Sequence, residues 1–279
     1  MIETHNLTKN FGAIGAVQSV NFSVGKGEVF GLLGPNGAGK TTTIRMLTTL
    51  LAPSSGSARV AGYDVVSDPL NVRRSIGVVP QMLNLDIELT CKENLEYHGR
   101  LHKVVSADRA ARTMELLRFV GLWDKRDTPV DHLSGGMRRR LLIARGLMHR
   151  PSVVFLDEPT VGLDPQARRM IWGLILDLKQ SGITILLTTH YIEEADLLCD
   201  RVAIMRAGKM MALGSPVDLK AVVGRYVLEC LGRHDVPRRF LWSREDALEA
   251  GKSMGCDVVA RDVTLEDVFI SLTGERIES

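Results

Sequence analysis

The chain has 279 residues, 45% of them hydrophobic and 24% charged, which is the composition of an ordinary globular protein with a full core. Its 35 basic and 33 acidic side chains leave a formal charge of +2, so no strong general attraction to nucleic acid or anionic lipid is expected. The longest apolar runs, such as residues 183–187, have strand length and fall short of the roughly 20 residues that a membrane-spanning helix needs. The polar start over residues 1–5 does not fit a signal peptide. Any work at a membrane is therefore expected to depend on another polypeptide.

The cysteines lie far apart, with no Cys-x-x-Cys pair and no histidine at metal-ligand spacing. They are Cys91, Cys199, Cys230 and Cys256. This pattern indicates reduced thiols and a cytosolic chain.

The first predicted elements are short strands over residues 2–7 and 20–24, and then a strand over 28–33 that leads directly into the sequence GPNGAGKT at 34–41. That sequence matches the pattern Gly-x4-Gly-Lys-Ser/Thr, whose backbone N–H groups surround the phosphates of a nucleotide. In this pattern the Lys meets the outer phosphates and the hydroxyl joins Mg²⁺. A helix is expected from Lys40 onward, which gives the strand, loop and helix context of a site for ATP or GTP. The residues predicted to hold the nucleotide are Asn36, Gly37, Ala38, Gly39, Lys40, Thr41 and Thr42, with Thr41 also a metal ligand.

An aromatic residue, Phe11, precedes this loop in the β-rich opening. Its flat face suits stacking on a nucleotide base, which contributes about 1 to 3 kcal/mol and is indifferent to the identity of the base. The alternative is an aromatic side chain buried in its own small sheet. A turn at 53–56 and a strand over 57–62 follow, so an antiparallel N-terminal β subdomain is expected.

Residues 75–79 are predicted to form a strand that ends at Pro80 and Gln81. The Gln81 amide at this strand end either ligates Mg²⁺ or water, or is an ordinary turn residue. From about 82 to 150 the sequence pattern predicts helices, because 90–93 has capping-box spacing and Ser106 can cap a second helix. This block indicates a helical subdomain inserted into an α/β core.

A second candidate anion site begins the third of these helices. Ser134 can cap a helix whose first N–H groups face an anion, because Gly135 and Gly136 have no side chains to cover them. One chain therefore carries two helix starts that suit phosphate.

Two acidic residues, Asp157 and Glu158, follow an apolar strand predicted over 153–156. Because successive strand side chains point to opposite sides, we assign Asp157 to the metal shell and Glu158 to the general base. His190 ends the next strand, predicted over 183–188, and is expected to contact the γ-phosphate. The alternative is that His190 is an ordinary surface or core histidine whose hydrogen bonds are satisfied within the protein.

The alternation of strands and helices predicts an α/β fold with a mostly parallel sheet and ligands at its carboxyl edge. Asp164 precedes Pro165 at the start of one of the helices, and a helix-capping role fully explains an acidic residue at this position.

We expect a nucleotide-binding domain over 1–216 and a small α+β accessory domain over 217–279. The tail is predicted to hold strands over 226–231 and 257–260, a helix over 244–254, and a capped helix from Thr264 to a stop at Gly274. A dimer contact is our hypothesis for the tail, with regulation or plain packing as alternatives.

Over about residues 1–216 the order of motifs resembles the nucleotide-binding subunit of ATP-binding cassette (ABC) transporters. The matching elements are the aromatic loop at Phe11, Walker A at 34–41, the Gln loop at Gln81, the signature at 133–137, Walker B with its glutamate at 153–158, the D-loop at 162–164 and the switch His190. The signature differs from the commonest form at Met137, where Gln is usual.

The resemblance implies a head-to-tail dimer in which ATP lies between one chain's Walker A and the other chain's signature. Ser134, Gly135, Gly136 and Asp164 would then belong to the nucleotide site, and Gln81 and Asp157 to the Mg²⁺ site. It also implies a separate multi-spanning membrane permease, a peripheral place on the cytoplasmic face of the membrane, and no nucleic-acid partner. Whether two identical chains or a mixed pair assemble is open, and identical chains suffice.

Residues 137–140 and 264–274 are similar to the daunorubicin-resistance type of exporter ATPase, the ABC-2 class. This resemblance favours export of a drug, antibiotic, lipid or glycan, while import stays open. Two other classes are alternatives: a soluble ABC ATPase acting on chromosomes, DNA breaks or ribosomes, and a nucleotide switch of another P-loop class. Near-neutral charge argues against a DNA clamp.

Overall fold

Three β-sheets organise the computed structural model, which describes residues 1–231, 238–252 and 256–274. The central sheet has the order β10-β9-β3-β8-β7-β6, and all its neighbours are parallel except β10, which runs antiparallel to β9. Its strands are β3 (Val29–Leu33), β6 (Ile76–Val79), β7 (Val153–Asp157), β8 (Thr184–Thr189), β9 (Arg201–Arg206) and β10 (Lys209–Gly214). Every residue of β3, β7 and β8 is buried, as in a parallel sheet covered on both faces. The predicted mostly parallel α/β core is confirmed.

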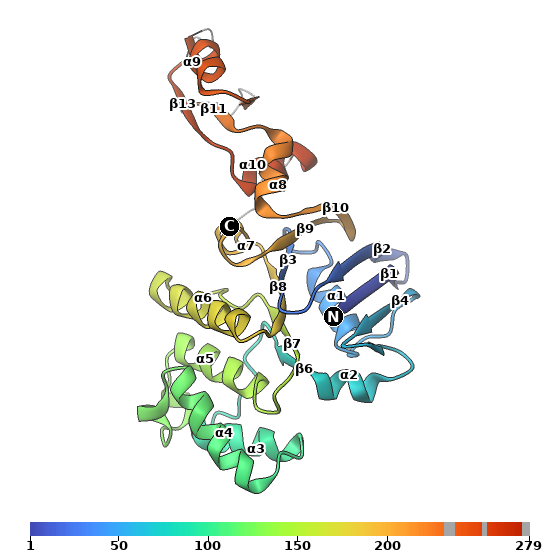
Figure 1. Ribbon diagram of the computed structural model, residues 1–279, viewed down its shortest axis with the longest axis vertical. Coiled ribbons are helices and arrows are strands. Elements are labelled where there is room, and N and C mark those ends of the chain that lie inside the picture. Colours follow the sequence, from blue (N-terminus) through green and yellow to red (C-terminus); the bar gives the residue numbers. More distant parts are fainter. Residues whose placement is uncertain (232–237, 253–255, 275–279) are drawn as a thin grey trace.

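A four-stranded antiparallel sheet lies beside one face of the central sheet (Figure 1). It consists of β1 (Ile2–Phe11), β2 (Ile14–Val24), β4 (Ser55–Val60) and β5 (Tyr63–Asp64). Its inner side chains share one hydrophobic cluster with α1 (Lys40–Leu47) and with central-strand residues such as Phe30 and Leu186. The ring centroids of Phe22 and Phe30 lie 5.0 Å apart in a stacked pair between the two sheets. This packing confirms the predicted β subdomain.

A helical block follows the short helix α2 (Pro69–Ser75) and strand β6. It contains α3 (Cys91–Leu101), α4 (Ser106–Phe119) and α5 (Gly135–Gly146), with single 3-10 turns at Trp123–Lys125 and Val130–His132. The Thr90 capping box of α3 and the Ser134 cap of α5 are both present. The predicted Ser106 cap is wrong, because Ser106 is already the first helical residue and Val105 stands at the cap position without a side-chain bond. Helices α6 (Pro165–Gln180) and α7 (Ile192–Leu198) continue the same layer against the central sheet.

The C-terminal segment extends from the β10 edge along the long axis of the molecule, at the end opposite to α3 and α4 (Figure 1). It comprises α8 (Pro216–Val223), β11 (Tyr226–Cys230), β12 (Arg239–Leu241), α9 (Arg244–Lys252), β13 (Val258–Asp262) and α10 (Leu265–Thr273). The strands form an antiparallel sheet in the order β12-β11-β13. Residues 253–254 of the predicted helix lie outside the described residues.

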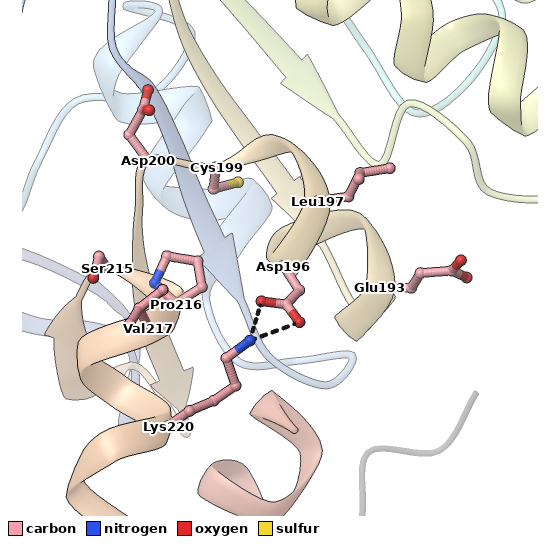
Figure 2. A pocket seen from close by; sticks show the side chains of 9 residues that line it. All are labelled: Glu193, Asp196, Leu197, Cys199, Asp200, Ser215, Pro216, Val217 and Lys220. Atoms are coloured by element: carbon pink, nitrogen blue, oxygen red, sulfur yellow. Dashed lines mark hydrogen bonds and ion pairs between the residues drawn. The ribbon is translucent and has the colours of Figure 1, made fainter. Parts of the chain in front are cut away.

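The C-terminal segment is fastened to the core by polar contacts as well as by packing. Lys220 Nζ of α8 lies 2.8 Å from Asp196 Oδ1 of α7 (Figure 2), and Arg206 Nη1 donates to the Thr273 carbonyl at 2.6 Å. Phe269 of α10 is buried in the same cluster as the central sheet. This segment therefore stabilises the edge of the sheet that carries β9 and β10.

The expectation of reduced thiols is wrong for two of the cysteines. Cys230 and Cys256 form a disulfide across a sequence separation of 26 residues, with their Cα atoms 6.0 Å apart. The pairing of β11 with β13, which sets Cys230 opposite Val258, brings the two sulfurs together and could not be read from spacing. Cys91 and Cys199 are free and buried, and burial raises the pKa of the Cys91 thiol to about 11.

None of the helices in the described ranges has both the length and the apolar character needed to cross a membrane.

Candidate nucleotide-binding site

The loop between β3 and α1 depends on glycine at two close approaches. A Cβ at Gly34 would lie 2.3 Å from the Met205 carbonyl oxygen, and one at Gly39 would lie 2.5 Å from the Ala16 carbonyl oxygen. Gly39 also has φ 99°, in the left-handed region that other residues rarely adopt. The two glycines therefore let the loop pack against these carbonyls, and the loop borders the space in front of α1.

That space is a cavity of about 260 Å³ at the N-terminus of α1. Every loop residue predicted to hold the nucleotide lines it, together with Gln81 and Glu158. The lining consists of Ala16, Asn36, Gly37, Ala38, Gly39, Lys40, Thr41, Thr42, Gln81 and Glu158. Ala16 of β2 was not predicted, because a small residue on a distant strand carries no sequence signal for a ligand.

Lys40 is buried beneath the loop and is held by three oxygens. Its Nζ donates to the carbonyls of Gly34 at 2.7 Å and Pro35 at 3.1 Å, and it lies 3.0 Å from Glu158 Oε1. The side chains of Lys40 and Glu158 are 5% and 4% exposed, so this ion pair is shielded from water. A buried ammonium group therefore lies beside the cavity in which phosphate charge would arrive.

Glu158 also contacts His190, the residue that follows β8. His190 Nδ1 lies 2.6 Å from Glu158 Oε2, so the structure brings the predicted base and the predicted switch histidine together. The alternation argument for the two acids does not apply here, because β7 ends at Asp157 and Glu158 has φ 50° rather than an extended conformation. The bend turns the Glu158 carboxylate toward Lys40 and His190.

Asp157 faces the hydroxyls of two threonines. Thr41 Oγ1 donates to Asp157 Oδ1 at 3.0 Å, and Thr188 Oγ1 donates to the same oxygen at 2.6 Å. The Thr188 hydroxyl in turn accepts from the Glu158 N–H at 3.0 Å, so it orients both acids. Thr188 was missed as a site residue. The signal available in the sequence was a polar side chain that ends the apolar run beginning at Ile185. In the structure Thr188 pairs with Asp157 in the sheet register.

Gln81 is exposed, and its backbone carbonyl accepts a hydrogen bond from a side chain of the helical block. Arg139 of α5 donates to the Pro80 carbonyl at 2.7 Å and to the Gln81 carbonyl at 2.8 Å. Burial lowers the pKa of the Arg139 guanidinium, and the Asp157 charge opposes that shift. Arg139 therefore links α5, the helix capped by Ser134, to the loop that carries Gln81, a role that the sequence did not reveal.

A further buried acid, Glu194, lies on α7. Its Oε1 accepts from Thr160 Oγ1 at 2.9 Å and from Trp172 Nε1 at 3.1 Å. Burial raises the pKa of this carboxyl. Glu194 holds α6 and the segment after Glu158 in place and does not line the cavity.

The remaining predicted site residues lie outside this cavity. Ser134 and Gly135 are exposed at the start of α5, where Ser134 Oγ accepts from the Met137 N–H at 3.3 Å. Gly136 is packed so closely that a Cβ would lie 2.8 Å from Ala167 Cβ of α6. Asp164 is exposed and caps α6 by accepting from the Ala167 N–H at 2.9 Å, as predicted.

Phe11 ends β1 with 51% of its surface exposed, and the Lys9 ammonium lies 5.4 Å from its ring centroid. The alternative of a ring buried in its own sheet is therefore wrong. Stacking on a base stays a prediction.

A larger cavity of about 600 Å³ lies between α7 and the start of α8 (Figure 2). The Lys220–Asp196 pair closes one side of it, and Cys199 and Pro216 form part of its wall. It contains none of the predicted site residues. Size alone therefore does not mark the functional cavity in this protein.

Similarity to known proteins agrees with this geometry. Residues 17–161 match the ABC transporter family. The daunorubicin/doxorubicin resistance ATP-binding protein DrrA of Streptomyces peucetius is 45% identical over 256 residues, covering 92% of this chain and 77% of that protein. The Nod factor export ATP-binding protein I of Ralstonia nicotianae is 41% identical over 305 aligned residues, covering 99% of this chain and 95% of that protein.

Two solved structures show the same architecture. A dimeric ATP-binding cassette in a post-hydrolysis state, bound to ADP and Pi, aligns with a TM-score of 0.70 and 28% identity, covering 77% of this chain and 98% of the other. A cassette from Clostridium perfringens that is part of an ABC transporter complex aligns with a TM-score of 0.73 and 30% identity, covering 79% and 90%. The chain therefore belongs to the ABC transporter family, as an ATP-binding subunit that hydrolyses ATP.

Proposed function

We propose that this subunit drives export through a separate membrane permease, using ATP hydrolysis at the carboxyl edge of its central sheet. One observation carries the proposal: Lys40 and Glu158 line the loop cavity, with Asp157 bonded to Thr41 and His190 beside Glu158, whereas Ser134 is exposed elsewhere. The names of the relatives, which concern drug resistance and Nod factor export, support export of a drug, antibiotic, lipid or glycan.

The oxygen atoms around Asp157 fit Mg²⁺, which prefers hard oxygen ligands. The Thr41 hydroxyl already contacts the Asp157 carboxylate, and Gln81 lines the same cavity as Thr41. We assign Thr41, Asp157 and Gln81 to the metal. Bound Mg²⁺ would neutralise charge that develops on the phosphates during transfer.

For hydrolysis we assign Glu158 as general base and His190 as the γ-phosphate contact. An arriving triphosphate competes with Glu158 for Lys40, because the phosphates carry more negative charge than one carboxylate. Transfer of Lys40 to the phosphates frees one carboxylate oxygen of Glu158 to accept a proton from water. His190 keeps the other oxygen oriented through its 2.6 Å contact.

The exposed start of α5 supports an ATP sandwich between two chains. Ser134, Gly135 and Gly136 present helix N–H groups at a surface where a partner's phosphates can bind, and Asp164 lies exposed near the same helix ends. Closure would be a population shift driven by contacts that ATP makes with both chains. Two copies of this chain suffice, since each carries both the loop site at Lys40 and the exposed helix start at Ser134.

The helical block offers an apolar surface for a membrane partner. Large side chains exposed on α3 and on the segment before it are Met82, Leu83, Ile87, Tyr97 and Leu101. We take these exposed apolar groups as a candidate interaction site. We therefore place the permease contact here and the protein on the cytoplasmic face of the membrane, with no nucleic-acid partner.

The direct test is co-purification of the full chain with multi-spanning membrane proteins from its own cells, beginning with any that a neighbouring gene encodes. We expect a stable complex whose ATPase activity responds to reconstitution in vesicles. Leu101→Arg should weaken the complex, whereas Val222→Arg, a change at a more exposed residue of α8, should not. Recovery of the chain with nucleic acid and without a membrane protein would overturn the proposal.

A further inference from the structure

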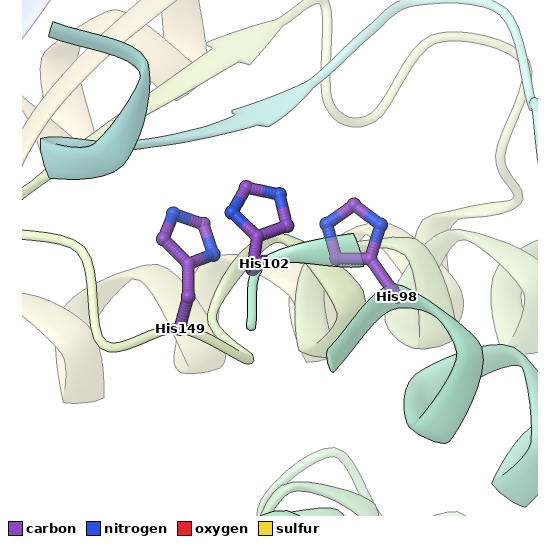
Figure 3. Close-up of side chains that lie close together, drawn as sticks. All are labelled: His98, His102 and His149. Carbon is purple, nitrogen blue, oxygen red and sulfur yellow. The ribbon is translucent and has the colours of Figure 1, made fainter. Parts of the chain in front are cut away.

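Three histidines gather in the helical block, away from the nucleotide cavity (Figure 3). His98 lies on α3, His102 caps its C-terminus, and His149 follows α5. Their potential ligand atoms all lie within 4.8 Å of one another. His102 lies between the other two rings, with centroid distances of 4.6 Å to His98 and 3.9 Å to His149.

The local packing explains why these side chains meet. His98 and His102 are four positions apart on one helix, so they project from the same face. Between them lies Gly99, where a Cβ would be 2.9 Å from both Arg109 Cδ and Met148 Cε. The missing side chain lets the end of α5 approach α3, and His149 follows directly. We expected no histidine at metal-ligand spacing, and this pair with its third partner corrects that expectation.

The hydrogen bond of His149 determines which of its nitrogens is available. His149 Nε2 lies 2.8 Å from the Ile76 carbonyl oxygen, which can only accept, so Nε2 carries the proton. Nδ1 is then left with its lone pair, buried and with no partner in the described part of the chain. Metal-bound histidines usually donate their second ring N–H to a carbonyl in this way. Figure 3 shows one ring nitrogen of His149 on the side of His102.

Burial keeps the three imidazoles in the neutral form that binds metals. It lowers the pKa of His98 to about 3 and that of His149 to about 4, and it lowers the pKa of His102 as well. The positive charges of Arg145 and Arg112 also lower the pKa of His98 and of His149, respectively. Each of these guanidiniums is hydrogen-bonded to other acceptors. Arg145 donates to the Asn84 carbonyl at 2.7 Å, and Arg112 donates to the Leu147 carbonyl at 2.9 Å.

These neighbours bear on the kind of ion. Their positive charges oppose any cation, and within the described residues this group of potential ligands holds no carboxylate. A hard ion such as Mg²⁺ or Ca²⁺ would therefore gain little here, because it needs oxygen ligands. Imidazole nitrogens suit zinc, copper and nickel.

We propose that His98, His102 and His149 form a binding site for a divalent transition metal of the zinc class, joining the end of α3 to the end of α5. Zinc binds imidazole nitrogen at about 2.0 to 2.1 Å, which sets tetrahedral ligand atoms roughly 3.3 Å apart. The His102 ring rotates out of its stack on His149 to direct its lone pair at the ion. A water completes the fourth position. The site does not depend on the proposed transport function.

The test is a calorimetric titration of Zn²⁺ into the full chain, purified without a histidine tag, stripped of metal and free of nucleotide, in millimolar Mg²⁺. We expect one equivalent to bind, and His102→Gln and His149→Gln each to weaken binding at least about tenfold. The matched control is His5→Gln, at an exposed position of β1, which should bind as the parent does. Retained ATP binding shows that each variant is folded.

A second measurement needs no variant. Co²⁺ bound by nitrogen ligands in four-coordinate geometry should give visible absorption bands at one equivalent, and Zn²⁺ should displace them. Absence of stoichiometric binding to the parent chain, or binding that His102→Gln and His149→Gln leave unchanged, would show that the three rings are only a packed stack and overturn the proposal.

Discussion

The two phosphate-facing helix starts of this chain differ in how complete they are. At α1, Lys40 is buried, and its oxygen contacts come from the segments that follow β3 and β7. At α5, Ser134 and Gly135 are exposed, and the only bond of the Ser134 side chain in the described residues caps its own helix. The first site is assembled within one chain, whereas the second presents donors that require a ligand from outside. This contrast is what an ATP sandwich between two chains demands.

The largest expected effect tests the chemistry of the complete site. Glu158→Gln removes the charge that accepts a proton while keeping a side chain of the same size. We expect the hydrolysis rate to fall by about 10² to 10⁴ with ATP binding retained, and closed dimers to accumulate. Turnover assays and light scattering with ATP measure both.

The control is Glu193→Gln, at an exposed glutamate of α7 that lies outside the cavity. Hydrolysis by Glu158→Gln near the parent rate would reject the base assignment.

The next effect concerns the incomplete site. Ser134→Arg places a bulky cation where a partner's ATP would bind, so ATP-dependent dimerisation should be lost while the single chain still binds ATP. His132→Arg, two residues earlier and 70% exposed, is the matched control. Dimerisation of the Ser134 variant as in the parent would count against the sandwich.

A smaller effect is expected from the threonine that orients both acids. Thr188→Val removes the hydroxyl bonded to Asp157 and to the Glu158 N–H, and a bond to a charged group contributes about 1.5 to 3 kcal/mol. We expect kcat to fall about tenfold. Thr184→Val on the same strand removes a partly buried bond from the Gly27 N–H, and it should lower stability but leave kcat intact. Equal kcat losses in the two variants would mean that Thr188 acts only through stability.

The smallest effect tests whether the two sites communicate through Arg139. The Lys side chain of Arg139→Lys cannot bond both the Pro80 and Gln81 carbonyls, so one hydrogen bond, worth about 1 kcal/mol, is lost. We expect a roughly fivefold weaker apparent affinity for Mg²⁺ in the ATPase assay. Gln81→Ala should shift the Mg²⁺ dependence in the same direction. An Mg²⁺ profile of Arg139→Lys identical to the parent's would exclude the coupling.

Local motifs gave the predictions that the structure confirms most directly. The caps at Thr90, Ser134 and Asp164 and the stop at Gly274, with φ 71°, depend on interactions within a few residues. The Ser106 cap failed because the helix begins one residue earlier than the polar side chain suggested. Helix ends are set by competing local bonds, so a one-residue error changes the identity of the cap.

The sequence by itself determined the phosphate loop, the order of the motifs and the mostly parallel sheet, because glycine geometry, capping and apolar runs act over short distances along the chain. Only the tertiary structure decided that Thr188 orients both acids, that Arg139 clamps the Gln81 loop, that Cys230 meets Cys256, and that His149 joins His98 and His102. Each of these contacts joins segments that lie far apart in sequence. They depend on strand register and helix packing, which are fixed only when the whole core forms.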